Sequence, residues 1–275
     1  MRSMSKGISK YTPFLKSTIQ ARMSYKFDFF MRIFGGLIQL MILYYLWMAI
    51  FNSSKTGVIE GFSSAEMIVY IIMTFITSQI INISIEWEIA EDIDRGDIAI
   101  NLIKPISYEK KILAQSLGNV LINLVTISLP IWIIFYGYKV IKLGEELPNI
   151  ENILLFILSL ILGYLVMFLF NFIFAISAFF VTYIWGFMMC KEVIITFLSG
   201  QLIPIVFFPE VLQNILKYLP FSAMNYTPVM IYMGKMSTDE MFFNIGIQCI
   251  WLVILLIAFR VLWSKAMKRV TVVGG

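Results

Sequence analysis

Long apolar runs, separated by short polar segments, account for most of the chain. A run of about 20 apolar residues is long enough to cross the hydrocarbon core of a bilayer as an α-helix. Because the runs are continuous and do not alternate with polar residues, they favour helices over the strands of a membrane β-barrel. The pattern predicts six membrane-spanning helices, at about 28–51, 66–84, 111–137, 151–183, 187–208 and 240–263.

Three of the predicted spans, the third, the fourth and the fifth, contain features that affect their shape or their ends. Pro130 lies inside the third span and predicts a kink there, because proline lacks the backbone N–H that a helix interior requires. The apolar region 151–208 must supply both the fourth and the fifth span. The only break in it is "TYIWGFMMCKE", which is marked by Gly186 and the Lys191–Glu192 pair.

The N-terminal segment 1–27 is expected to be helical without crossing the membrane. It is basic, and its apolar residues Phe14, Leu15, Ile19 and Met23 recur near helical spacing. This pattern is typical of an amphipathic helix that lies in the membrane interface, and a flexible basic tail is the alternative.

Prolines divide the apolar stretch 199–234 into pieces of about ten residues, which are too short to span a bilayer. The prolines are Pro204, Pro209, Pro220 and Pro228. Irregular backbone enters a membrane only where it packs on protein or lines a cavity. The segment 209–239 can therefore form short re-entrant helices on the external side, before the sixth span, and an ordinary external loop is the alternative, which its apolar content disfavours.

Composition supports an integral membrane protein. Of the 275 residues, 60% are hydrophobic and only 14% are charged, whereas a soluble domain carries about a quarter charged residues. The expected fold is an all-α integral membrane protein with a single transmembrane domain over residues 1–275. The sequence contains no histidine, which excludes catalytic triads and zinc sites built on that residue.

The distribution of Lys and Arg predicts the orientation, since these residues concentrate on the cytoplasmic side of membrane proteins. With six spans, the termini share a side with the loop 85–110, with Lys111 directly after it, and with Lys191. That side carries 16 of the 21 basic residues. Both termini are therefore expected in the cytoplasm, including the segment 1–27 and the tail 264–275.

The first cytoplasmic loop is strongly acidic, with seven of the chain's 17 Asp and Glu residues in "IEWEIAEDIDRGDIAINLIKPISYEKK" at 85–111. Ile85, Ile89 and Ile93 recur every four residues and acids fill most other positions, which predicts a short amphipathic helix. Gly96 is placed to end this helix, since glycine is favoured just after a helix C-terminus.

After this helix, the loop is expected to continue as an apolar link to the third span. Pro105 disfavours a helical conformation at Lys104 because of its ring. Ser107 is a suitable N-cap for the next helix, and Glu109 in the first turn complements the helix dipole.

Three interpretations of the acidic loop are open at this point. It is a solvated acidic loop, a magnesium–diphosphate site built from the acids of 91–97, or a docking helix for a cytoplasmic protein. Carboxylates can hold magnesium in this way in intramembrane prenyltransferases, but those enzymes use a second Asp-rich loop on the same face, which this sequence lacks. The apolar stripe with charged flanks favours docking, because a helix lodged in a groove is a common mode of recognition.

A few polar residues within or near the predicted spans mark candidate positions for a path through the membrane. They are Gln39, Gln79, Asn119, Asn123, Asn171, Gln201 and Gln248. Asn119 and Asn123 lie four residues apart, hence on one helical face, and are the candidates for lining a cavity. Hydrogen bonding between helices, worth about 0.6 kcal/mol on average in membranes, is the alternative for each polar residue.

Several motifs, in this order and spacing, resemble one family of transport proteins. The chain has "YKFDFFMR" at the first span with Trp47 near its end, "RGDIAINLIKPIS" after the second span, and "SGQLIPIVFFPEVLQNILKYLPF" followed by "YTPVMIYMG". Together with the tail "KRVTVVGG", these resemble the membrane-spanning permease subunits of ATP-binding-cassette (ABC) exporters, which move drugs, lipids and polysaccharides outward. The resemblance covers essentially the whole chain.

The resemblance implies a transporter in the bacterial cytoplasmic membrane, built from two permease subunits, identical or homologous, and two copies of a cytoplasmic ATPase. It implies that the helix at about 86–95 docks on the ATPase as a coupling helix. The residues expected at that contact are Glu88, Ile89, Asp92, Ile93 and Arg95.

The sequence contains no G-x-x-x-x-G-K-[S/T] motif, the loop that cradles ATP phosphates. The chain is therefore expected to be a transport subunit and not an enzyme, with no cofactor of its own and with ATP and magnesium in the partner ATPase. Membrane lipids are the other expected partner, and nucleic acid is not one. The alternative function is an intramembrane lipid-modifying enzyme that uses the 91–97 acids with magnesium.

Overall fold

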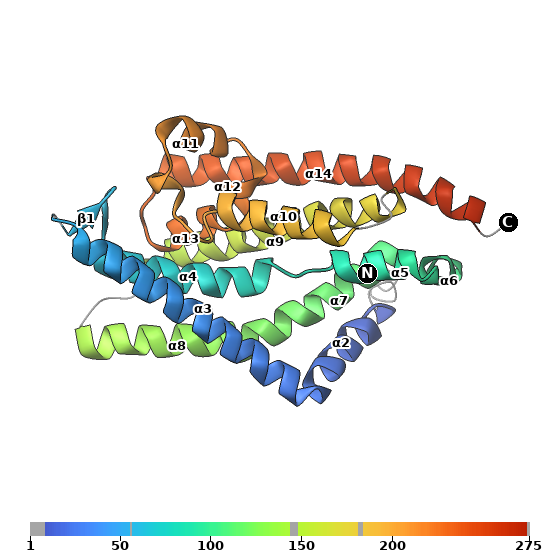
Figure 1. The fold of residues 1–275 in the computed structure, drawn as a ribbon, viewed down its shortest axis with the longest axis horizontal. Helices are drawn as coiled ribbons and strands as arrows, with labels where there is room; N and C mark the ends of the chain where they lie inside the picture. Colours follow the sequence, from blue (N-terminus) through green and yellow to red (C-terminus); the bar gives the residue numbers. More distant parts are fainter. Residues whose placement is uncertain (1–8, 56, 144–147, 181–183, 274–275) are drawn as a thin grey trace.

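The computed structural model describes residues 9–55, 57–143, 148–180 and 184–273 (Figure 1). Three parts of the expected elements lie outside the described residues: 1–8 of the N-terminal segment, 181–183 of the fourth span, and 274–275 of the tail. The described chain is almost entirely helical, which confirms the all-α class expected from the apolar pattern.

The longer helices carry most of the structure. They are α2 (Thr12–Ser24), α3 (Lys26–Ser53), α4 (Ser64–Ile81), α7 (Tyr108–Asn123), α8 (Leu129–Tyr138), α9 (Ile150–Ile176), α10 (Trp185–Leu198) and α14 (Thr238–Val273). The shorter α-helices are α5 (Glu86–Asp94), α6 (Asp97–Ile103), α11 (Glu210–Leu216), α12 (Pro220–Met224) and α13 (Tyr226–Tyr232). The remaining elements are the π-helical turns η1 (Leu124–Ser128) and η2 (Lys139–Leu143), the 3₁₀ turns η3 (Ser177–Phe179) and η4 (Ile205–Phe207), and the antiparallel strands β1 (Val58–Ile59) and β2 (Phe62–Ser63).

Five helical segments in the described part of the chain are long and apolar enough to cross a membrane. They are Lys26–Ser53, Ser64–Asp94, Tyr108–Ile141, Ile150–Phe179 and Thr238–Lys268. The expected fifth span corresponds to α10, which has only 14 residues. A helix of that length reaches about 21 Å, less than a hydrocarbon core of about 30 Å. The count of six spans is therefore not confirmed.

The break between the expected fourth and fifth spans lies earlier in the chain than the sequence indicated. α9 ends at Ile176 and α10 already begins at Trp185, so Lys191 and Glu192 lie inside a helix. These charges were expected to mark the break between the two spans. The Lys191 side chain is instead buried with a charged partner, so it needs no contact with water.

The expected third span changes direction between α7 and α8 (Figure 1). α7 continues through η1 into α8, and Pro130 stands in the first turn of α8. Just before it, Leu129 N donates a hydrogen bond to Leu124 O across the π-helical turn. Helix kinks arise at prolines and at π-bulges, and both occur at this position.

α9 is the central helix, against which α4, α5, α12, α13 and α14 pack. Its residues Val166, Phe172 and Ala175 are each 0% exposed. Gly163 allows α12 to approach closely, since a Cβ at this position would lie 2.7 Å from Met224 O. The largest apolar cluster of the described core is therefore built around α9.

The peripheral helices present apolar surface outward. α3 buries only Trp47 and Phe51 among its 28 residues, and exposed apolar side chains also lie along α8 and α14. Extensive exposed apolar surface marks contact with a membrane or with another protein. α5, α6 and the C-terminal end of α14 lie at one end of the molecule, with β1 and α11 toward the opposite end (Figure 1).

α2 forms a helix in the expected N-terminal segment and packs along α7. Gly118 of α7 permits the contact, because a Cβ there would lie 2.9 Å from Leu15 O. No residue of α2 is fully buried, as expected for a helix on the surface of the protein. Its location in the membrane interface stays a prediction.

Each proline of the expected re-entrant region stands at the start of a short helical piece. Pro204 precedes η4, Pro209 precedes α11, Pro220 opens α12, and Pro228 lies in the first turn of α13. α12 and α13 are largely buried and pack against α9. Packing on protein is the condition under which such pieces can enter a membrane, but re-entry itself stays a prediction.

Candidate functional site

α5 occupies the acidic loop at the position where the sequence predicted a helix. It runs from Glu86 to Asp94. Gly96 follows with a φ of 75°, in the left-handed region that glycine adopts without strain, and the helix ends there as predicted. The apolar link expected next is instead the short helix α6, whose first turn contains Asp97 in the position that the helix dipole favours.

The start of α7 agrees in part with the prediction made from the sequence. Lys104 is extended ahead of Pro105, as predicted, and α7 begins at Tyr108. Ser107 occupies the N-cap position, but its side chain makes no capping hydrogen bond. Its backbone N–H instead donates to the hydroxyl of Tyr11 at 3.0 Å, which ties the start of α7 to the segment before α2.

The apolar stripe of α5 faces the chain's own core. Ile85 and Ile89 are 3% and 0% exposed and belong to the cluster built on α9. Ile93 is partly buried against the same cluster. Ile89 was expected to pack in a groove of the ATPase, but here α9 and its neighbours already cover it.

Two acids of α5 are bound by residues of α7. Asp92 Oδ2 accepts a hydrogen bond from the Tyr108 hydroxyl at 2.8 Å, and Lys111 Nζ lies 3.6 Å from the same oxygen. Glu88 Oε1 accepts a hydrogen bond from Gln115 Nε2 at 2.7 Å. Both acids were expected to contact the ATPase, whereas in this structure they fasten α5 to α7.

A buried charged pair holds the N-terminal end of α5. Lys191 Nζ of α10 lies 2.6 Å from Glu86 Oε1, and each side chain is 3% exposed. Lys191 Nζ also donates to Asn171 Oδ1 of α9 at 2.8 Å, and Asn171 Nδ2 donates to Ile83 O at 3.2 Å. The network therefore joins α5, α9, α10 and the link after α4.

This network was not predicted from the sequence, although the sequence contains a signal for it. Lys191 lies in an apolar run and Asn171 lies within an expected span. Polar and ionisable residues inside membrane helices are costly unless they have partners, so each one predicts a partner elsewhere in the chain. What the sequence did not indicate was that Glu86 would be that partner.

A polar cavity of about 240 Å³ lies beside the buried pair, and Glu86 and Lys191 line it. Four of the polar residues singled out in or near the spans also line it, namely Gln39, Gln79, Asn171 and Gln201. The cavity therefore brings together polar side chains from α3, α4, α9, α10 and the segment after α10.

Asn119 and Asn123, the expected path-lining pair, are not among the residues that line this cavity. Asn123 Nδ2 donates to Gln79 O at 2.8 Å, which is a hydrogen bond between α7 and α4. Asn119 Oδ1 is buried and has no hydrogen-bond partner in the described part of the chain. A role for either residue in lining a path stays a prediction.

The outer face of α5 and α6 is exposed and largely charged. Glu91 and Arg95 form an ion pair at 2.6 Å with side chains 57% and 68% exposed. Asp94 is exposed, and Ile100 and Ile103 of α6 are 60% and 85% exposed. Apolar side chains with polar residues around them are typical of a protein contact surface. Of the five residues expected at the ATPase contact, Arg95 is the one that is exposed on this face.

The described residues contain no group of three or more His, Cys, Asp or Glu side chains that could hold a metal ion. Within the acidic cluster, Glu91 pairs with Arg95 while Asp92 bonds to Tyr108, so the two carboxylates are engaged by different partners. The alternative of a magnesium-dependent enzyme at 91–97 therefore has no support.

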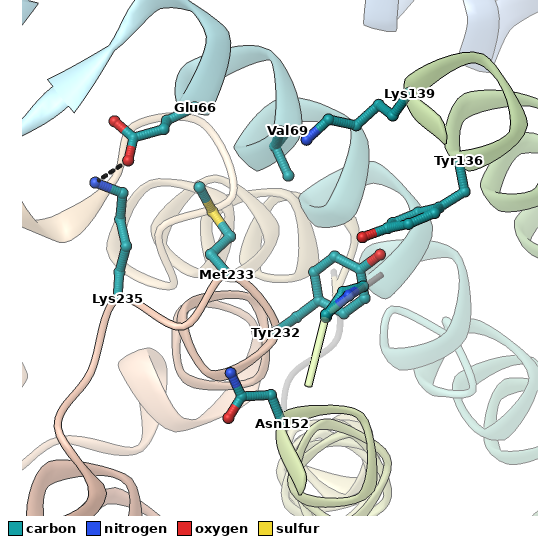
Figure 2. A pocket seen from close by; sticks show the side chains of 9 residues that line it. Glu66, Val69, Tyr136, Lys139, Asn152, Tyr232, Met233 and Lys235 are labelled. Carbon is teal, nitrogen blue, oxygen red and sulfur yellow. Dashed lines mark ion pairs between the residues drawn. The ribbon is translucent and has the colours of Figure 1, made fainter. Parts of the chain in front are cut away.

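A second polar cavity, of about 230 Å³, lies between α4, α8 and α13 (Figure 2). Lys235 Nζ lies 2.7 Å from Glu66 Oε1 on one side of it, and Figure 2 shows this ion pair apart from the two tyrosines Tyr136 and Tyr232. The Tyr232 hydroxyl accepts a hydrogen bond from Trp132 Nε1 at 2.9 Å. These contacts join the proline-rich segment to α4 and α8.

The fold and these sites define a multi-pass helical membrane protein. A family model described as "ABC-2 family transporter protein" matches residues 37–274. The chain therefore belongs to the ABC-2 family of transporter proteins, which are membrane domains of ABC transporters and generally pair with ABC ATPase subunits. The match confirms the resemblance that the motifs indicated. A search of curated proteins finds no match to the chain.

Proposed function

We propose that the chain is the permease subunit of an ATP-driven exporter and forms half of the path across the membrane. Its partners are a cytoplasmic ABC ATPase, present in two copies, and a second permease subunit, identical or homologous. ATP and magnesium are bound by the ATPase. The excess of Lys and Arg supports an orientation with both termini, α5 and α6 in the cytoplasm, at the cytoplasmic membrane of a bacterium.

The observation that carries this proposal is the two-sided character of α5. Its inner face is fastened by Glu86, Glu88, Ile89 and Asp92 to α7, α9 and α10. Its outer face, with the Glu91–Arg95 pair, is exposed. A coupling helix requires both properties, because it must follow its partner on one side and move its own helices on the other.

In this mechanism, ATP closes the ATPase dimer and each α5–α6 unit moves with the ATPase that it contacts. The contacts of Glu88 and Asp92 pass the movement to α7, and the Glu86–Lys191 pair passes it to α10. The path between the two permeases then changes the side to which it opens. Movement is transmitted only if α5 and α6 make different contacts in the two states of the ATPase.

The contact surface that we propose differs from the residues first expected. It consists of Glu91, Asp94, Arg95, Ile100 and Ile103. Glu88, Ile89 and Asp92 do not belong to this surface, because they hold α5 against other helices of the same subunit. Ile93, which is partly buried, lies between the two sets.

Site-specific photo-crosslinking tests the proposal. A photoreactive amino acid is placed at Asp94 or at Ile100 on the proposed contact surface, and at Val211 of α11, which is 73% exposed, as the control. The permease is coexpressed with an ABC ATPase from the same organism that copurifies with it. Crosslinks to the ATPase are expected from Asp94 and Ile100 and not from Val211.

Crosslinking from Val211 with equal yield would contradict the proposed orientation. Absence of a crosslink from both Asp94 and Ile100, in a complex that copurifies intact, would contradict docking through α5 and α6. A magnesium-dependent turnover by the permease alone would instead favour the enzyme alternative.

A further inference from the structure

A groove of about 780 Å³ lies where α2 and the residues before it meet the start of α7. Lys10 and Lys110 line it together with the polar Ser107. Leu15 of α2 and Leu117 of α7 also line it and supply apolar surface. The groove is therefore amphipathic, with two cations and an extended apolar floor.

The charges of this groove suit an anion. Among the described residues that line it, none is Asp or Glu. Lys10 and Lys110 are exposed, and neither has an ion pair within the described part of the chain. Ser107 Oγ is buried and lacks a hydrogen-bond partner among the described residues. The N-terminus of α7 adds a helix dipole whose positive end favours negative charge.

The apolar floor continues along α7 away from the two lysines. Leu113 and Leu117 line the groove, and Leu121 and Val125 line a second cavity of about 640 Å³ that is almost wholly apolar. These four residues are spaced by four and so lie along one side of the helix. Leu117, Leu121 and Val125 are 38%, 42% and 61% exposed.

We propose that this groove binds an anionic phospholipid. The headgroup phosphate lies between Lys10 and Lys110, and the acyl chains follow the apolar side of α7. A free phosphate ion would not need the apolar floor, and a neutral lipid would not need two lysines without acidic partners. Basic pockets beside membrane helices are known to favour anionic headgroups. The site is separate from the ATPase contact, so it does not depend on the proposed function.

Native mass spectrometry of the purified full-length chain in detergent tests this site. The chain is titrated with dioleoylphosphatidylglycerol or with dioleoylphosphatidylcholine, and bound lipid is counted. The wild-type chain should prefer the anionic lipid. Lys10→Gln with Lys110→Gln should weaken its binding by more than about tenfold, since each basic residue near an anionic surface contributes on the order of fivefold. The control is Lys16→Gln with Lys265→Gln, which removes two exposed lysines that do not line the groove.

A second variant tests the apolar floor without changing charge. Leu117→Gln, at a partly exposed position, should also weaken binding of the anionic lipid, and inorganic phosphate should not displace the lipid. Four results would overturn the proposal: equal binding of both lipids, equal losses in the two lysine pairs, unchanged binding in Leu117→Gln, or displacement by phosphate. Each measurement is independent of transport and of ATPase activity.

Discussion

Lys191 Nζ lies 2.6 Å from Glu86 Oε1, and both side chains are 3% exposed, although 105 residues separate them in the chain. A buried ion pair is costly to form, but removing one partner costs still more, because it leaves an uncompensated charge in the interior. The pair connects α5 to α10, so it couples the proposed ATPase contact to a helix beside the polar cavity.

Replacing Lys191 with Met should lower the stability of the purified chain by about 3–5 kcal/mol, because Glu86 would be left as an unpaired buried carboxylate. Combining Lys191→Met with Glu86→Gln should recover most of that loss, since no charge then remains unpaired. The apparent midpoint of thermal unfolding in detergent compares the three proteins. Equal midpoints for the single and the double variant would show that the pair is not coupled.

Asp92 is expected to hold α5 against α7. Asp92→Ala should destabilise the chain by about 1–3 kcal/mol, because Tyr108 and Asn101 lose the carboxylate that accepts their hydrogen bonds. Asp94→Ala, which removes an exposed acid from the same helix, should change stability by less than about 0.5 kcal/mol. The apparent midpoint of thermal unfolding in detergent compares the two variants. An equal decrease of the midpoint in both would rule out this role for Asp92.

The close approach of α12 to α9 depends on Gly163. In Gly163→Ala, the new Cβ would meet Met224 O at 2.7 Å, and overpacking of this kind costs about 1–3 kcal/mol. Gly35→Ala in α3 is the matched control, because no atom of a described residue beyond the adjacent turns of its own helix lies within 4 Å of the added Cβ. It should be neutral or stabilising by up to about 1 kcal/mol through helix propensity. A Gly163→Ala protein as stable as the wild type would contradict the packing described for α9.

Features that depend on local chemistry were predictable from the sequence. Gly96 ends α5 because glycine tolerates the left-handed conformation, and Lys104 is extended because Pro105 follows it. The helices of the apolar runs follow from the length of the runs and from the absence of polar alternation within them. The start of α4 at Ser64 was missed by two residues, because the capping box of Ser63 and Glu66 was not recognised.

Features that depend on contacts distant in the chain were not predictable. Ile89 was assigned to the ATPase contact. An apolar stripe on a helix indicates that the stripe is covered, but it does not indicate whether another protein or the chain itself covers it. In this structure α9 covers Ile89. Glu88 and Asp92 were assigned to the ATPase because charged residues flanking an apolar stripe are typical of a docking helix, whereas Gln115 and Tyr108 bind them in this structure. These pairings join residues far apart in the chain, and the spacing of residues along a single sequence does not indicate which of them meet in the fold.

Transmission through the outer face of α5 is tested most directly by exchanging the charges of Glu91 and Arg95. Glu91→Arg with Arg95→Glu keeps an ion pair at the same spacing, so the helix retains its internal contact while the charges presented to a partner are reversed. The matched control is Asp28→Arg with Arg32→Asp in α3, an exposed pair of the same spacing.

The measurement is the ATP hydrolysis rate of the coexpressed ABC ATPase in complex with each permease, reconstituted in lipid nanodiscs. Reversal of the Glu91–Arg95 pair should reduce the rate to that of the ATPase without permease, while the α3 control should keep the wild-type rate. Full stimulation by the Glu91–Arg95 variant would contradict coupling through α5, as would an equal loss in the control.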